Sequence, residues 1–246
     1  MKIDFYEEFP SKENLSKLKL INFNSRVFLA AKSLGEFKQL KKQAKAINKK
    51  IECAYWPIIP NSYWISPFSN NEDLIKIFRE LLGCKDKILI DLELPILNKK
   101  MFLKNILSFK KNKKLIYEFL RKNKKRVITA QFPSATLSWL AKILGLDYNL
   151  NLEKSFMWYS SMIPKFLNKR IKKYLVKLKD KSNHTLSLGT IAVGIFGNEP
   201  ILSPNKLEGD LEFIQKSGFN RVTIFRLGGL NEDYIQVIDK FCSNNL

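Results

Sequence analysis

Eight short apolar runs, each followed by a segment with helical spacing, succeed one another along the 246 residues of the sequence. Strands that alternate with helices predict a parallel sheet, because each helix returns the chain to the end where the previous strand began. Eight such units in a chain of about 250 residues favour an α/β fold of the (β/α)8 TIM-like barrel type. We expect a single domain over residues 1–246. An open, doubly wound sheet is the alternative.

The predicted strands are apolar runs, and the predicted helices keep apolar residues three or four positions apart. The strands are expected at Lys2–Phe9, Arg26–Ala31, Ile51–Trp56, Lys87–Glu93, Arg126–Gln131, Ser155–Tyr159, Thr185–Thr190 and Arg221–Arg226. The helices are expected at Ser11–Leu20, Leu34–Asn48, Leu74–Leu82, Met101–Lys122, Thr136–Leu144, Pro164–Leu178, Lys206–Lys216 and Asn231–Phe241. Within the longest of these helices we expect a break near Lys110–Lys114.

The charge of the chain is large and unevenly distributed. The sequence has 43 Lys and Arg against 23 Asp and Glu, a formal net charge of +20. Between Asn98 and Lys181, 22 basic residues face four acids, so +18 of this charge lies in about a third of the chain. Such a sector is typical of contact with a polyanion, a nucleic acid or an anionic membrane surface. No nucleic-acid motif accompanies it, so we expect nonspecific polyanion contact or a solvated surface.

Several classes of protein and site are disfavoured by the sequence. Met1 to Phe5 leads straight into the first predicted strand, and no apolar run has membrane-spanning length, so we expect a cytoplasmic protein without integral membrane association. Three widely spaced cysteines lack zinc-site spacing. The single histidine, His184, argues against a histidine-rich metal site, and a Ser-His-Asp triad would have to include this residue. We expect no metal and no cofactor.

The fourth predicted strand ends in two carboxylates. Side chains alternate between the faces of a strand, so Asp91 and Glu93 point the same way, with Cα atoms about 6.6 Å apart. At the carboxyl end of a barrel strand, that direction leads into the mouth, where barrel enzymes carry catalytic residues. Two like charges this close raise one pKa, so we predict Glu93 as general acid/base and Asp91 as its partner. A structural ion pair with Arg226 or Lys32 is the alternative.

The other strand ends bring acids, aromatic rings and amides to the same mouth. Rings stack on the apolar face of a sugar and carboxylates do acid/base work, so this mixture predicts a carbohydrate or another small polar ligand. The residues expected around the mouth also include Glu7 or Glu8, Lys32, Ser33, Tyr55, Trp56, Gln131, Trp158 to Ser160, Asn198, Glu199 and Arg226. The residues predicted as substrate contacts are Glu7, Tyr55, Trp56, Trp64, Gln131, Tyr159 and Arg226.

The loop after the third predicted strand, residues 57–69, carries Tyr63, Trp64 and Phe68 among three prolines. That is more aromatic surface than a connection needs, and long loops in compact domains are often functional. We predict a stacking wall or lid over the mouth. A loop packed by its own aromatic side chains is the alternative.

Two segments resemble the chitinase-like glycoside hydrolase family 18. Asp86-Lys87-Ile88-Leu89-Ile90-Asp91-Leu92-Glu93 is similar to that family's fourth-strand signature, in which alternate aspartates lead to a catalytic glutamate. Met157-Trp158-Tyr159 is similar to its Met-x-Tyr-Asp segment. By position, the resemblance implies that Glu93 protonates the glycosidic oxygen, Asp91 orients the substrate N-acetyl group and Tyr159 hydrogen-bonds that group. Lys87, Leu89 and Ser160 depart from the family pattern.

Gly228 and Gly229 follow the eighth predicted strand, where barrels often bind phosphate through backbone N–H groups. A tight strand-to-helix turn is the alternative reason for two glycines. The sequence therefore supports three hypotheses: a barrel hydrolase that acts on or binds a carbohydrate, a noncatalytic barrel that binds a polyanion through its basic flank, and a phosphate-ligand barrel enzyme.

Overall fold

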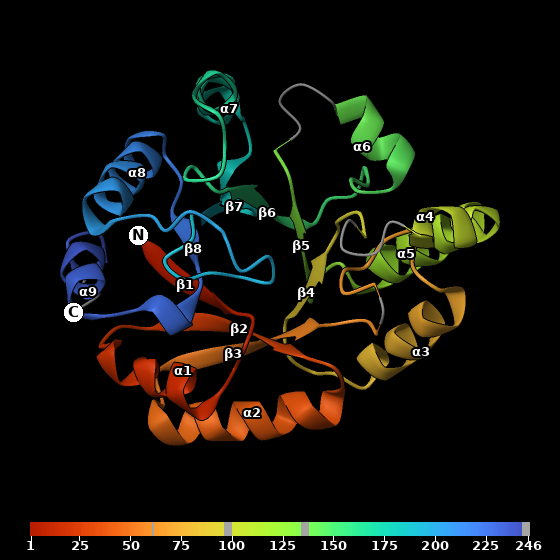
Figure 1. Ribbon diagram of the computed structural model, residues 1–246, viewed down its shortest axis with the longest axis horizontal. Coiled ribbons are helices and arrows are strands. Elements are labelled where there is room, and N and C mark those ends of the chain that lie inside the picture. The colour runs from red at the N-terminus through yellow and green to blue at the C-terminus, as the bar shows by residue number, and fades with distance from the viewer. Residues whose placement is uncertain (61, 96–99, 134–137, 243–246) are drawn as a thin grey trace.

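The computed structural model describes residues 1–60, 62–95, 100–133 and 138–242, and Figure 1 shows helices arranged around a central barrel. Eight parallel strands close in sequence order, with β8 beside β1. The fold is a single-domain (β/α)8 barrel, which confirms the fold predicted from the alternation of strands and helices. The strands are β1 (Lys2–Glu7), β2 (Ser25–Ala31), β3 (Ile51–Pro57), β4 (Ile88–Asp91), β5 (Val127–Gln131), β6 (Glu153–Trp158), β7 (His184–Leu188) and β8 (Arg221–Phe225).

Helices follow each strand and cover the outside of the barrel. They are α1 (Lys12–Ser16), α2 (Leu34–Ile47), α3 (Asn71–Leu82), α4 (Lys100–Lys104), α5 (Phe109–Asn123), α6 (Ser138–Leu144), α7 (Lys165–Lys177), α8 (Pro204–Lys216) and α9 (Glu232–Asp239). The 3-10 turns are η1 (Lys17–Leu20), η2 (Ile106–Ser108), η3 (Lys181–Asn183) and η4 (Leu227–Gly229). The start predicted at Thr136 lies outside the described residues. No helix in the described ranges is both long and apolar enough to cross a membrane.

The long helix predicted for Met101–Lys122 is divided earlier than expected. α4 ends at Lys104 and α5 begins at Phe109, so Lys110–Lys114 lie inside a continuous helix. At the break, the Asn105 side-chain amide donates to the Phe68 carbonyl oxygen (2.9 Å). Asparagine bonds readily to backbone groups outside its own helix, which favours an interruption at this residue.

Side chains along each strand alternate between the barrel interior and the layer under the helices. In β1, Ile3 and Phe5 pack in the large outer core, whereas Tyr6 belongs to the inner cluster. At mid-height, Tyr6 Oη lies 2.8 Å from Ser155 Oγ and 3.0 Å from Ser187 Oγ. The centre of the barrel is therefore filled by side chains and leaves its functional surface at the ends.

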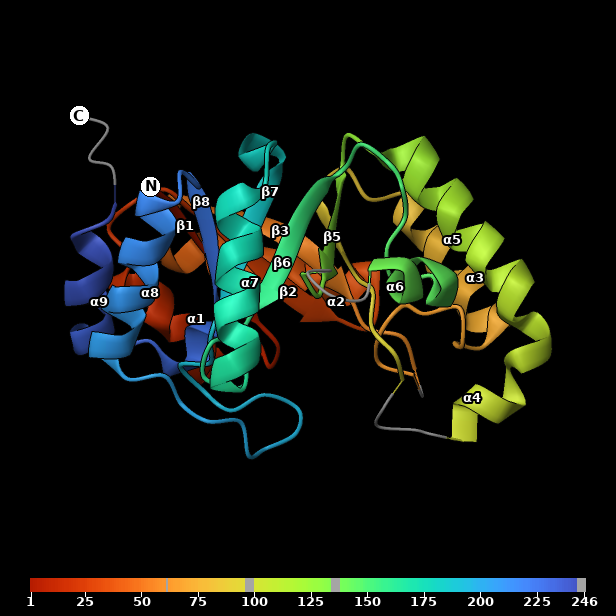
Figure 2. The same ribbon diagram turned by 90° about the horizontal axis from the view of Figure 1, so that it is seen from above.

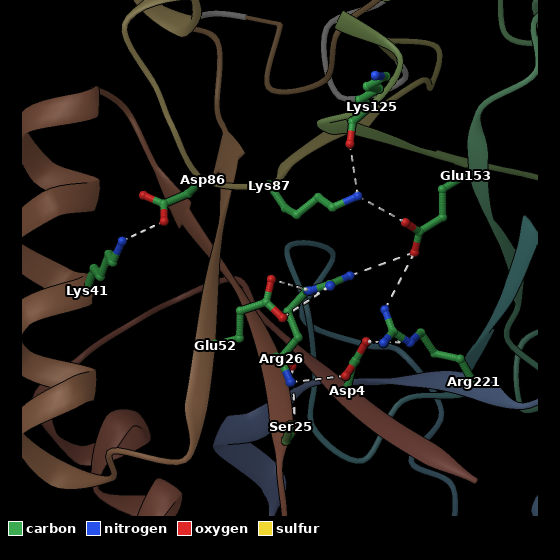
Figure 3. A network of polar contacts seen from close by, with 10 residues as sticks. All are labelled: Asp4, Ser25, Arg26, Lys41, Glu52, Asp86, Lys87, Lys125, Glu153 and Arg221. Carbon is green, nitrogen blue, oxygen red and sulfur yellow. Dashed lines mark hydrogen bonds and ion pairs between the residues drawn. The ribbon is translucent and has the colours of Figure 1, made fainter.

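Charged side chains join the amino ends of the strands (Figure 3). Arg26, Lys87 and Arg221 all lie within ion-pair distance of Glu153, at 3.7, 3.5 and 3.7 Å. Asp4 adds a contact of 3.6 Å to Arg221. This network ties strands that are distant in sequence at the end opposite to the mouth.

Candidate active site at the barrel mouth

A small cavity of about 60 Å³ lies at the carboxyl ends of the strands. Acids and aromatic rings from several strands and loops form its walls together with apolar side chains. The side chains with chemical groups suited to a reaction or to stacking are Glu8, Trp56, Asp91, Glu93, Tyr159 and Glu199. The mouth of the barrel thus brings together residues that are far apart in the sequence, such as Glu8 and Glu199.

Asp91 and Glu93 both line this cavity because backbone pairing continues past the last residue of β4. Leu92 N–H donates to the Ala130 carbonyl oxygen (3.0 Å), and Ile65 N–H donates to the Asp91 carbonyl oxygen (3.1 Å). The chain therefore stays extended between the two acids, and both side chains emerge on the inner side. In the described ranges, neither Arg226 nor Lys32 forms an ion pair with these acids, and Arg226 pairs with Glu7 instead (3.1 Å).

Burial is the main cause of the raised pKa values of these two carboxyls. It raises the pKa of Glu93 to about 7, and the nearby charge of Glu8 adds to the effect. Asp91 is only 6% exposed, and burial, Glu93 and Glu8 raise its pKa well above the ordinary value. Asp91 Oδ1 is buried without a hydrogen-bond partner among the described residues. A carboxyl that is partly protonated near neutrality is suited to general acid catalysis.

Glu8 and Glu199 place two further acids in the cavity wall. Burial raises the pKa of Glu8 to about 7, against the hydrogen bond that Tyr63 donates to Glu8 Oε1. Glu199 Oε1 accepts from the Phe196 N–H (3.0 Å). Within the described structure, Glu8 Oε2 and Glu199 Oε2 are buried without partners. The mouth is therefore rich in acceptors although the chain as a whole is strongly basic.

Aromatic rings line the space between these acids. Trp56, Trp64 and Tyr159, all predicted as substrate contacts, lie in the wall of the cavity. The Tyr6 ring lies 5.7 Å from the Trp56 ring, and the Tyr159 ring lies 5.7 Å from the Phe225 ring, as measured between centroids. These faces are suited to stacking against a sugar ring, and the contact itself stays a prediction.

The loop between β7 and α8, residues 189–203, closes the cavity from outside. Figure 2 shows this loop projecting beyond the barrel on the same side as α4. The Phe196 ring lies 6.2 Å from the Trp64 ring. Ligand pockets commonly measure about 300–1,000 Å³, whereas a water occupies about 30 Å³ of the liquid. The cavity in this structure is therefore much smaller than a typical ligand pocket.

The aromatic side chains of the loop of residues 57–69 are divided between the mouth and the helix layer. Trp64 lines the cavity and Tyr63 donates to Glu8, so part of the loop contributes to the mouth. Phe68 packs instead against Phe102 of α4 and Phe109 of α5, with both pairs of centroids 4.9 Å apart. A role of this loop as a stacking wall or lid stays a prediction.

Glu7 and Arg226 differ from their predicted positions. Glu7 is fully buried and faces away from the cavity, where its Oε1 accepts from Arg226 Nη1 (3.1 Å) and its Oε2 accepts from Gly228 N–H (2.7 Å). The Glu7 carboxylate thus already accepts the Gly228 N–H that was predicted to bind a phosphate. Gly229 also has a packing role, because an added Cβ would lie 1.9 Å from the Ile191 carbonyl oxygen.

Tyr55 and Gln131 also face away from the mouth. The Tyr55 ring stacks on Phe37 of α2, with centroids 4.9 Å apart. Gln131 Oε1 lies 3.4 Å from Thr129 Oγ1, and the neighbouring Ala130 lines the cavity instead. Adjacent residues of a strand point to opposite faces, so these side chains belong to the layer under the helices.

Other predicted positions are distributed between the two ends of the barrel. Ser33 Oγ accepts from Glu36 N–H as the cap of α2 (3.1 Å). His184 begins β7 at the end opposite to Asp91, and its ring stacks on Phe156 with centroids 4.9 Å apart. It therefore cannot form a triad at the mouth. Within the described ranges, no cluster of three His, Cys, Asp or Glu side chains is arranged to hold a metal ion.

Tyr6, Phe196 and Phe225 line the cavity without having been predicted as substrate contacts. Tyr6 could have been found from its position two residues before Glu8 on one strand. Arg226 was predicted to face the mouth, but Phe225, one residue earlier, faces it instead, because adjacent residues of a strand point to opposite faces. Phe196 lies in an irregular loop, where no strand or helix period indicates its direction.

No protein-family model matches the sequence, and no curated protein matches it. Its structure is similar to the PgaB (BpsB) glycoside hydrolase domain from Bordetella bronchiseptica, with a TM-score of 0.61, 11% identity and coverage of 100% of this chain and 99% of that chain. It is also similar to the C-terminal domain of a putative chitinase from Desulfitobacterium hafniense DCB-2, with a TM-score of 0.62, 12% identity and coverage of 98% of this chain and 97% of that chain. A third similar structure is a glycoside hydrolase family 18 N-acetylglucosaminidase from Paenibacillus barengoltzii, with a TM-score of 0.55, 9% identity and coverage of 98% of this chain and 99% of that chain. These structural similarities bear out the predicted resemblance to family 18 for the fold.

Proposed function

We propose that this chain is a glycoside hydrolase-like barrel protein that binds a glycan at its mouth and cleaves a glycosidic bond, with Glu93 as general acid/base. The observation that carries the proposal is the pair Asp91 and Glu93, two acids with raised pKa values in the wall of one cavity. The fold shared with structures described as chitinases and glycoside hydrolases supports it. Trp56, Trp64 and Tyr159 are the proposed substrate contacts.

The chemistry follows from the protonation state of Glu93. With a pKa of about 7, the side chain retains a proton in a large fraction of molecules near neutrality and donates it to the glycosidic oxygen. As the bond to the anomeric carbon breaks, the acetamido oxygen of an N-acetylated sugar closes on that carbon, held by Asp91 and Tyr159. Water then opens this ring, and the Glu93 carboxylate accepts the proton of the water.

The test is the replacement Glu93→Gln, which keeps the shape of the side chain and removes its acid. We expect hydrolysis of N-acetylglucosamine oligomers to fall by at least about 100-fold, since general acid catalysis contributes roughly 10²–10⁴. Release of reducing ends measures turnover, and thermal unfolding shows that the variant is folded. Glu118→Gln on the exposed face of α5 is the matched control. Unchanged turnover in Glu93→Gln would remove Glu93 from the proposal.

A noncatalytic glycan-binding barrel is the second candidate, and Leu89 favours it. This apolar residue stands on the inner face of β4 at the position where the family 18 signature carries an aspartate. The two candidates differ in the wild-type protein. Binding of the oligomers in calorimetry, without release of reducing ends, selects the noncatalytic role.

The predicted polyanion contact and cytoplasmic location also remain proposals. α7 and the adjoining face of α8 border a groove of about 670 Å³ that is lined by Lys165, Lys169, Lys172, Lys173 and Lys177. Binding of a polyanion there would fall steeply with salt. Cys53, Cys84 and Cys242 are all free thiols, which suits the reducing environment of the cytoplasm.

A further inference from the structure

Large apolar side chains are exposed after three neighbouring strands on one side of the barrel mouth. They follow the carboxyl ends of β4, β5 and β6, and their exposed fractions run from 41% for Met162 to 96% for Leu107. We name the following six residues the apolar rim: Leu103, Ile106, Leu107, Trp139, Met162 and Phe166. Figure 1 shows α4, α6 and α7, which carry or adjoin these residues, around one part of the barrel with α5 between α4 and α6, and Figure 2 shows α6 set back from α4 toward the middle of the barrel.

Exposed lysines accompany the apolar rim. Lys100 and Lys104 lie on α4 beside Leu103, and Lys165 and Lys169 lie in the first turns of α7 beside Phe166. We name these four residues the rim lysines. They belong to the sector between Asn98 and Lys181 that carries a net charge of +18. Figure 2 shows α4 and the start of α7 on the same side of the barrel as the loop after β7.

The combination of apolar and cationic side chains restricts the kind of partner. Exposed apolar groups that lie together mark a contact surface, and Leu103, Ile106 and Leu107 fall within five residues of one another on α4 and η2. A nucleic acid complements the lysines, but it offers no apolar surface to the aliphatic Leu103 and Leu107. A second copy of this chain would cover the leucines but would bring together two surfaces with the same strong positive charge. An anionic lipid surface matches both features, with headgroups for the lysines and acyl chains for the apolar side chains.

We propose that the apolar rim and the rim lysines dock the barrel onto an anionic phospholipid membrane, with the mouth turned toward the headgroups. Leu103, Leu107 and Phe166 enter the boundary between headgroups and acyl chains. The lysines contact phosphate and other anionic groups. This docking depends on the outer surface alone, so it stands whether or not Glu93 is a catalytic residue.

Sedimentation with lipid vesicles tests the docking. Vesicles of phosphatidylcholine alone are compared with vesicles of phosphatidylcholine and phosphatidylglycerol in equal parts. We expect the wild-type protein to bind the anionic vesicles and to remain in solution with the neutral ones. Added salt weakens the binding, because it screens the lysines.

Two sets of variants separate the apolar and the cationic contributions. The triple replacement Leu103→Ser, Leu107→Ser and Phe166→Ser should weaken vesicle binding by at least about tenfold, since each removes buried apolar area in the bound state. Its control is Leu82→Ser with Val176→Ser, two exposed apolar residues at the other end of their helices. Replacing the four rim lysines by Gln should weaken binding by about fivefold per residue. The control with the same net charge replaces Lys122, Lys124, Lys125 and Lys179 by Gln.

The other occupants predict different results. Self-association would give a dimer mass in light scattering that the leucine replacements return to the monomer. If the lysines alone made the contact, as with a soluble polyanion, the triple serine replacement would leave vesicle binding unchanged. Either result, or failure to bind anionic vesicles at low salt, would overturn the membrane proposal.

Discussion

At the scale of single residues, the site depends on which face of a strand a side chain occupies. Glu7 and Glu8 are neighbours, yet Glu7 is held by Arg226 under the helices and Glu8 lines the mouth. Both faces of a barrel strand are apolar, so the sequence carries no alternation of polarity that assigns them. The common direction of the Asp91 and Glu93 side chains was predictable, because residues two apart in an extended chain point to the same face. The inward or outward direction of Glu7, Tyr55 and Gln131 was not predictable.

Glu93 should lower the stability of the folded protein at neutral pH and above. Its pKa rises from an ordinary 4.5 to about 7 on folding, so the folded state binds the proton more tightly. The corresponding stabilisation is complete below pH 4.5 and is lost as the pH rises to about 7. Glu93→Gln escapes this loss and should be more stable than wild type above pH 7, by up to about 3 kcal/mol.

Urea unfolding of both proteins over this pH range measures the difference. The advantage of Glu93→Gln should disappear as the pH falls below 4.5, where the wild-type carboxyl becomes protonated in both states. Glu118→Gln serves as a control of opposite sign, because the hydrogen bond from Arg121 lowers the pKa of Glu118. A constant difference across the range would contradict the raised pKa of Glu93. A variant that gains stability and loses hydrolysis would show that the acid is retained for function.

At the scale of elements, the loop of residues 189–203 lies against the acids of the mouth. Its Gly194 lies so close to the mouth that an added Cβ would come within 2.8 Å of Glu199 Oε1 and Phe225 Cζ, and within 2.9 Å of Glu8 Oε2. The sequence indicates a glycine-containing connection here but not its fold across the mouth. Such contacts form between segments far apart in the chain, and a local period says nothing about them.

Gly194→Ala should therefore displace this loop or the acids beneath it. We expect weaker binding and slower hydrolysis of N-acetylglucosamine oligomers, with a loss of stability of about 1–3 kcal/mol from overpacking. Gly209→Ala is the matched control, since an added Cβ in the middle of α8 meets no atom within 4 Å. It should raise stability by about 0.5–1 kcal/mol and leave hydrolysis unchanged. Equal effects of the two substitutions would show that Gly194 has no particular role.

At the scale of the whole molecule, the two ends of the barrel have different tasks. The alternation of eight strands and helices was sufficient to predict the closed barrel, because each unit repeats the same local pattern. The ion network at the amino ends was not predictable from Arg26 or Glu153 alone, since it joins strands that closure brings together. At this end the charges are paired (Figure 3), whereas at the mouth Asp91 and Glu8 each keep an oxygen without a partner among the described residues. Pairing at one end and unpaired acids at the other suit stability and chemistry, respectively.

Glu153→Gln tests this division, because Glu153 is the shared anion of Arg26, Lys87 and Arg221. Its removal leaves Arg26 paired only with Glu52, Arg221 only with Asp4, and Lys87 with no ion pair among the described residues. The side chains of Arg26, Lys87 and Arg221 are only 7, 31 and 24% exposed, so we expect a loss of about 1–3 kcal/mol in urea unfolding. Glu118→Gln removes an exposed pair and should change stability by less than about 1 kcal/mol. At temperatures where both variants are folded, their hydrolysis should equal that of wild type. A Glu153→Gln protein that is fully stable, or folded yet slower in hydrolysis, would show that the amino end is not a separate stabilising layer.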